Sequence, residues 1–183
     1  MTTAEFDKGR IEKLEAELDP EMRFRPLLPT AGWIVAVALF GLSCFHYYTA
    51  GFGLLQETLH RGIHIACVLG LIFLVFSWNQ RGNAATPRAS LFFPLGISVI
   101  DWICCIAAVI TSLYVPYVFH DLQFRVGNPD PMDWMMGTVM IVVLLEATRR
   151  SVGWPLPIIA VVLILYALYG PSLPGILAHP GNS

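Results

Sequence analysis

A short charged step, LLEATRR at residues 144–150, separates two apolar runs of the sequence. A charged side chain at a membrane boundary is costly unless it faces lipid headgroups or a partner, so this step predicts the end of one membrane crossing. On one helix, Glu146 would reach Arg149 at i+3 and Arg150 at i+4, which would neutralise its carboxylate. We therefore predict a salt bridge at the inner boundary, with one arginine left over for a lipid phosphate or a neighbouring chain.

The composition around this step is that of a membrane protein. Hydrophobic residues make up 56% of the 183 residues and charged residues only 13%, whereas about a quarter of a soluble domain is charged. Five of the eleven basic residues lie within the first 25 positions. The sequence predicts an all-α integral membrane protein with a cytoplasmic segment containing a short amphipathic helix (1–26), followed by a membrane domain.

Five apolar runs approach the roughly 20 residues that a helix needs to cross the hydrocarbon layer. Glycine- and proline-rich breaks separate them. The second, fourth and fifth runs are short for a steep span, but flanking aromatic and charged residues at the interface add length. The fifth run is the weakest candidate, and five crossings would place Ser183 outside. The runs are 31–49, 63–78, 99–119, 132–147 and 155–169.

The basic residues predict the orientation. With the N-terminus inside, nine Lys and Arg residues fall on the inner side and two on the outer side, which is a strong positive-inside bias. Residues 1–26 contain acidic residues and no apolar core, so we expect no cleavable signal peptide there. The prediction is a multi-pass membrane protein with a cytoplasmic N-terminus. The outer pair is Arg61 and Arg125; the inner set is Lys8, Arg10, Lys13, Arg23, Arg25, Arg81, Arg88, Arg149 and Arg150.

Asp101 follows the apolar segment 91–100, which is interrupted by Pro94 and Gly96. We interpret this segment as lying along the inner membrane surface, so that Asp101 and Trp102 open the third crossing. In this interpretation Asp101 lies near a helix N-terminus among the headgroups. A proton-carrying Asp embedded in the membrane is the minor alternative.

The remaining reactive residues do not form a recognisable site. The four cysteines lie within apolar runs without metal-site or redox spacing, so we expect small buried hydrophobic groups. His60 and His64 share one helix face near the outer boundary, whereas bis-histidine haem needs one imidazole from each of two facing helices. No catalytic set is evident, and a net charge of -2 without a basic aromatic patch argues against nucleic acid. We expect neither enzyme activity nor a metal or cofactor.

Several motifs together resemble a known family. They are RVGNP at 125–129, LLEATRRSVG at 144–153, LYA at 165–167, the Gly-Pro and Pro-Gly pairs at 170–171 and 174–175, His179 and Gly181, and, earlier, RGIH at 61–64 and the Asp101-Trp102 pair. The chain from about residue 30 onward resembles the amino-terminal small-subunit region of TRAP transporters of the TAXI type. The Glu-x-x-Arg-Arg step between two apolar runs is the most specific of these motifs.

The resemblance implies a role in secondary active transport of organic anions across a bacterial inner membrane. It also implies that the membrane part consists of a four-helix small-subunit bundle (27–152) and a connector helix with a tail (153–183). In this family a large M-type membrane subunit carries the substrate and ion sites, a soluble periplasmic protein delivers the substrate, and a small Q-type subunit braces the large one. The resemblance therefore implies that this chain contacts the large subunit, the binding protein and lipids, but not the substrate. It also implies docking through the outer loops, where Glu57, Asp121, Arg125 and Asp130 are candidate contacts, with Arg61 at the outer interface.

Two other functions are compatible with the sequence. The small subunit of a tripartite tricarboxylate transporter has the same four-helix organisation and would pair with a different large subunit. A haem-bearing membrane anchor of an oxidoreductase is the more distant alternative.

Overall fold

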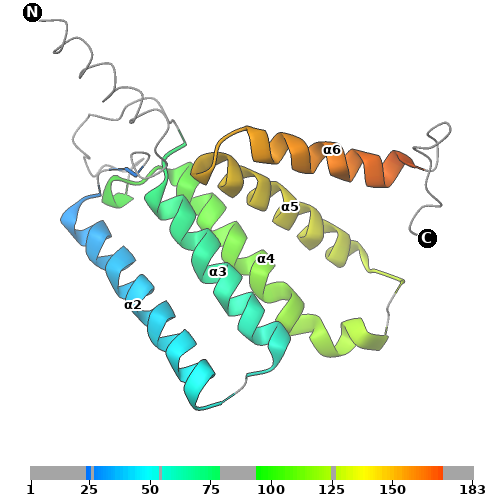
Figure 1. The fold of residues 1–183 in the computed structure, drawn as a ribbon, viewed down its shortest axis with the longest axis horizontal. Helices are drawn as coiled ribbons and strands as arrows, with labels where there is room; N and C mark the ends of the chain where they lie inside the picture. The colour runs from blue at the N-terminus through cyan, green and yellow to red at the C-terminus, as the bar shows by residue number, and fades with distance from the viewer. Residues whose placement is uncertain (1–23, 26, 54, 79–93, 125–126, 171–183) are drawn as a thin grey trace, which may run out of the picture.

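A computed structural model describes residues 24–25, 27–53, 55–78, 94–124 and 127–170. Five α-helices and one 3-10 turn make up its regular structure, and the described residues contain no strand. Four helices run side by side, and the fifth turns away at one end (Figure 1). The helices are α2 (Pro29–Gly51), α3 (Glu57–Val75), α4 (Val99–Phe124), α5 (Pro131–Ser151) and α6 (Pro155–Tyr169), with the 3-10 turn η2 (Pro94–Gly96) before α4.

Four of these helices are long and apolar enough to cross a membrane, namely α2 to α5. The predicted all-α membrane fold is confirmed at this level. The second and fourth apolar runs are extended by polar flanking residues, so that α3 has 19 residues and α5 has 21. At about 1.5 Å per residue these helices are close to the thickness of the hydrocarbon layer. The fifth, α6, has only 15 residues.

Local sequence explains where the helices begin and end. Proline occupies the first turn of α2, α5 and α6, where its missing N–H costs nothing. At the start of α5 the backbone N–H of Asp130 donates to Asp133 Oδ2 at 2.9 Å, as in a capping box. Gly153 has a φ of 107°, which favours glycine, and it reverses the chain between α5 and α6.

The core lies between α3, α4 and α5. Leu69 and Phe73 of α3 pack with Ala108 of α4 and with Val143 and Ala147 of α5. The helix α2 packs against α3 only near its ends, where Ala31, Val35 and Thr49 are buried while the residues between them are largely exposed. Helix α6 packs against α5 and buries only Pro157. The bundle therefore has a tight three-helix centre with two loosely attached outer helices.

Helices α3 and α4 cross most closely at Gly62. A Cβ atom at this position would overlap the Pro116 ring and come within 3.0 Å of the Ser112 carbonyl oxygen. Gly70, two turns further along α3, faces Cys105. Small residues spaced in this way let two helix backbones approach, which is how helices commonly associate in lipid. Gly41 and Gly137 have open space instead.

The segment before α4 packs into the end of the bundle. Within its described residues, Leu95 adopts a left-handed conformation with φ 59°. Ile97 is 2% exposed and packs with Ala31, Val35, Leu71 and Leu74. From residue 95 onward the chain is therefore packed between the ends of α2 and α3, and its predicted place along the inner membrane surface stays a prediction. The predicted amphipathic helix in 1–26 lies outside the described residues.

Candidate functional site

Asp101 lies at the centre of a buried ionic cluster. It occupies the first turn of α4, is 1% exposed, and accepts hydrogen bonds from two arginines that come from distant parts of the chain. Arg25 Nη2 donates to Asp101 Oδ2 at 2.5 Å, and Arg150 Nη1 donates to Asp101 Oδ1 at 2.6 Å. A carboxylate at a helix N-terminus is also favoured by the helix dipole. We call this the arginine end of the bundle (Arg25, Asp101, Glu146, Arg149 and Arg150).

The two arginines that contact Asp101 also cap helix α3. The last carbonyl groups of a helix have no partner within it. Arg25 Nη2 donates to the carbonyl oxygens of Phe73 at 3.2 Å and Phe76 at 2.9 Å. Arg150 Nη1 approaches the Phe76 oxygen at 3.4 Å. The cations thus lie at the negative end of the α3 dipole while holding the anion at the positive end of α4.

Glu146 is the second carboxylate of the cluster, and it pairs with Arg149 and Arg150. Arg149 donates through Nε and Nη2 to the two Glu146 oxygens, each at 2.8 Å, and Arg150 Nε donates to Oε1 at 2.6 Å. The i+3 and i+4 pairs predicted from the sequence are therefore confirmed. Two carboxylates and three guanidiniums form one connected network that links the ends of α3, α4 and α5 to the segment preceding α2.

Aromatic rings surround the cations. The Arg150 guanidinium carbon lies 4.9 Å from the centre of the Phe73 ring and 5.4 Å from that of Trp78. Arg149 lies 5.0 Å from Trp78 and 5.5 Å from Trp154. Such contacts attract a cation to the ring face and gain strength when water is excluded. The arginines Arg149 and Arg150 are therefore both paired with carboxylates and packed against aromatic rings.

Among the described residues, the cluster brings three arginines together with two carboxylates. Two of its nitrogen atoms, Arg25 Nε and Arg150 Nη2, are buried without a hydrogen-bond partner among the described residues. A buried donor without a partner costs free energy. Within the described part of the chain, the cluster is therefore well paired apart from these two donor atoms.

Asp101 lies near the N-terminus of α4, as predicted, and is enclosed by Arg25 and Arg150. Arg150, with a side chain that is 0% exposed, is shared between Asp101 and Glu146. Contact of an arginine of this cluster with a lipid phosphate or a neighbouring chain stays a prediction. Trp102 is half-buried and packs against the cluster around Ile97, so it is not a freely exposed interfacial residue.

The opposite end of the bundle brings together three histidines, and we call it the histidine end (His46, His60 and His64). His46 Nε2 of α2 lies 2.9 Å from His64 Nδ1 of α3, and the His46 ring centre lies 5.3 Å from that of His60. Sequence analysis placed His60 and His64 on one face but did not pair them with His46. The contact joins the imidazoles of two neighbouring helices through their ring nitrogens. No group of three or more potential ligands in the described part of the chain is arranged to hold a metal.

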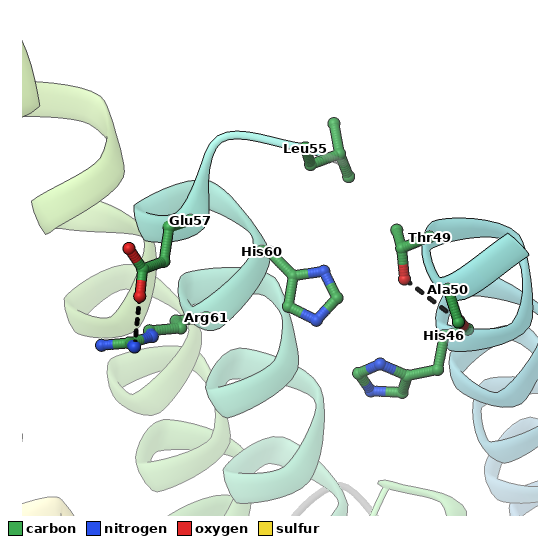
Figure 2. A pocket seen from close by; sticks show the side chains of 7 residues that line it. All are labelled: His46, Thr49, Ala50, Leu55, Glu57, His60 and Arg61. Atoms are coloured by element: carbon green, nitrogen blue, oxygen red, sulfur yellow. Dashed lines mark hydrogen bonds and ion pairs between the residues drawn. The ribbon is translucent and has the colours of Figure 1, made fainter. Parts of the chain in front are cut away.

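A cavity of about 610 Å³ opens beside these histidines. Figure 2 shows that His60 and His46 point toward one another across it, while Glu57 and Arg61 form an ion pair on the other side of α3. The Thr49 hydroxyl is turned back into its own helix, donating to the carbonyl oxygens of Phe45 and His46. The polar groups therefore do not converge on a common point in this cavity.

The candidate docking residues are dispersed over the histidine end. Glu57 opens α3, Asp121 is exposed in the last turn of α4, and Asp130 precedes α5. Arg61 is largely exposed and paired with Glu57. Arg125 lies outside the described residues. The structure places the three described acidic candidates at one end of the bundle but does not bring them into one cluster.

Comparison with known proteins adds no identification. No family model matches the chain, and neither a curated protein nor a solved structure is similar enough to count as a match.

Proposed function

We propose that this chain is the small membrane subunit of a TRAP-type secondary active transporter, which braces a large transport subunit in a bacterial inner membrane. The observation that carries the proposal is the distribution of charge along the four long helices. Every charged residue of α2 to α5 lies within the first or last two turns of its helix. A scaffold needs this arrangement, whereas a carrier commonly places its site near the membrane midplane.

The exposed apolar surface agrees with a bracing role. Only 11% of the most apolar window of α2 and of α5 is buried within the chain. Helix α6 is apolar on every side and almost entirely exposed. A helix that is apolar all round is found in a membrane or in a protein core. Lipid and a larger membrane partner would together cover this surface, and the family resemblance of the 144–153 motif selects the M-type transport subunit as that partner.

The charge distribution favours a cytoplasmic arginine end. Arg25, Arg149 and Arg150 lie at that end, and Arg61 is the basic residue at the histidine end within the described part of the four spans. Basic residues are enriched on the cytoplasmic side. The histidine end would then face the periplasm, where Glu57, Asp121 and Asp130 are available to a substrate-binding protein of the TAXI type. In this arrangement α6 leads from the cytoplasmic side toward the large subunit as a connector.

Two measurements test the proposal: the composition of the native complex and the uptake of substrate. A tagged copy of the full chain is extracted from the host membrane in mild detergent, and its partners are identified by mass spectrometry. We expect an equimolar membrane protein with many more spans, and binding-protein-dependent uptake that disappears when this chain is deleted and returns when it is supplied again. A solitary chain with unchanged uptake after deletion would contradict the proposal. A tricarboxylate-type large subunit would select the rival transporter family, and a Soret absorbance band would select the haem anchor.

A further inference from the structure

His46 and His64 direct ring nitrogens at one another across the gap between α2 and α3. His46 Nε2 lies 2.9 Å from His64 Nδ1, and the two residues belong to neighbouring helices, near the end of α2 and near the start of α3. A neutral imidazole has one N–H and one nitrogen lone pair, so one ring donates and the other accepts. A single shared proton therefore joins the two helices at this point.

The distance between the two nitrogens also suits a shared metal ion. Imidazole nitrogens bind Zn²⁺ at about 2.0–2.1 Å, so two of them on one ion are about 2.9–3.4 Å apart when their angle at the metal lies between a right angle and the tetrahedral angle. The His46–His64 separation of 2.9 Å falls at the short end of this range. Small rotations of the rings therefore suffice to aim both lone pairs at one ion.

The third histidine of this end is placed differently. The His60 ring stacks on Phe45, with ring centres 5.1 Å apart and planes 27° from parallel. Its centre lies 5.3 Å from that of His46. The three imidazoles do not surround one point, since no group of three ligands in the described residues is arranged to hold a metal. His60 is therefore a neighbour of the facing pair and not a ligand in this arrangement.

The surroundings of the pair supply a route for an ion and its further ligands. The cavity of about 610 Å³ at the histidine end is lined by His46, and Figure 2 shows the His46 ring extending from α2 into the space in front of His60. Water occupies the positions of a metal ion that protein ligands leave open. Glu57 is not a rival ligand, because its carboxylate pairs with Arg61 on the other side of α3. An ion at the pair would therefore have two imidazoles and water as ligands.

We infer that His46 and His64 bind one divalent ion of the first transition row through the two facing nitrogens, with water from the cavity completing the coordination. Imidazole suits Zn²⁺, Cu²⁺ and Ni²⁺. The ring that donates in the free pair carries its proton on its other nitrogen when the ion is bound, so both imidazoles stay neutral and each offers a lone pair. The ion replaces the shared proton and ties α2, which is buried only near its ends, to the three-helix centre. This inference does not depend on the proposed transport role.

The test measures Zn²⁺ binding to the purified full-length protein by calorimetry, with an affinity tag that contains no histidine. His46→Gln and His64→Gln each remove one ligand. His60→Gln is the matched control, because it removes a histidine of the same end that is not a ligand. We expect one Zn²⁺ per chain at this site, bound at least about ten-fold more weakly by either ligand variant, since even the outer partner of a ligand contributes that much. The control should bind Zn²⁺ as the unmodified chain does, and any Zn²⁺ held by the four cysteines should be the same in all variants.

X-ray absorption of the Zn²⁺-loaded, unmodified protein identifies the ligands without any substitution. We expect two imidazole nitrogens at about 2.0 Å from the ion. The two ligand variants lie on different helices, so either one decides the outcome if the other does not fold, which thermal unfolding without Zn²⁺ reveals. Three results would overturn the inference: Zn²⁺ binding that survives the ligand variants, an equal loss of binding in His60→Gln, or a site with only sulfur and oxygen ligands.

Discussion

At the scale of single residues, the arginine end shows how buried charges can be tolerated in an apolar bundle. Asp101 has two cationic partners and Glu146 has two, with Arg150 shared between them. Removing one partner of a buried ion pair leaves the others desolvated and unpaired, which is far more costly than losing an exposed pair. The network is therefore sensitive at its centre, and Asp101 is that centre.

We predict that Asp101→Asn lowers the free energy of unfolding by about 3–5 kcal/mol, because Arg25 stays buried after losing its carboxylate partner and Arg150 keeps only Glu146. The matched control is Asp121→Asn, which removes a carboxylate from an exposed position near the other end of α4 and should change stability by less than about 0.5 kcal/mol. Thermal unfolding of the purified protein in detergent measures both. Equal stability of the two variants would show that Asp101 is not the centre of the network.

The sequence predicted the local part of this cluster and not the rest. The Glu146 pairs follow from i+3 and i+4 spacing on one helix, which any helix provides. The partners of Asp101 lie 76 and 49 positions away along the chain. They meet because the segment before α2 and the ends of α4 and α5 come together beside the end of α3, which the hydrophobic pattern does not encode. The His46–His64 contact was missed for the same reason, since it depends on how α2 sits against α3.

At the scale of helices, the apolar runs identified each element but not the helix ends. The predicted run 63–78 became α3 (Glu57–Val75), because polar residues before the run continue the helix and the chain becomes extended at Phe76. The run 155–169 coincides with α6, which is bounded by Pro155 and Gly170. Hydropathy finds the apolar centre of a helix, whereas its ends depend on capping and on neighbouring elements.

The crossing of α3 and α4 provides a prediction at this scale. Gly62→Ala should destabilise the protein by about 1–3 kcal/mol, because the added methyl group collides with Pro116 and forces the helices apart. Gly41→Ala is the matched control in the middle of α2, where nothing lies within 4 Å of the new atom. There alanine should leave stability unchanged or raise it slightly, since glycine is a poor helix former. Thermal unfolding of both variants gives the comparison. If Gly62→Ala were as stable as Gly41→Ala, the close crossing of α3 and α4 would be refuted.

At the scale of the whole molecule, the decisive property is the number of crossings. Helix α6 leaves the arginine end and slants away from the bundle beside α5 (Figure 1). Its 15 residues span about 22 Å, which is less than the hydrocarbon thickness of about 30 Å. It is nevertheless apolar on all sides, so burying it in the membrane is favourable even if the bilayer must thin around it. A short fifth crossing toward the outside is therefore expected.

Single cysteines introduced into a cysteine-free variant of the chain test this topology. In spheroplasts treated with a membrane-impermeant maleimide, we expect labelling of Ser183→Cys and of Asn128→Cys, which lies between α4 and α5, and protection of Thr3→Cys. Labelling of Asn128→Cys is the control for orientation, and protection of Thr3→Cys is the control for an intact membrane. Labelling of Asn128→Cys with protection of Ser183→Cys would show that α6 returns to the inner side, leaving four crossings. Labelling of Thr3→Cys with protection of Asn128→Cys would invert the bundle and place the arginine end outside, because these two positions lie on opposite sides of the membrane whenever α2, α3 and α4 each cross it.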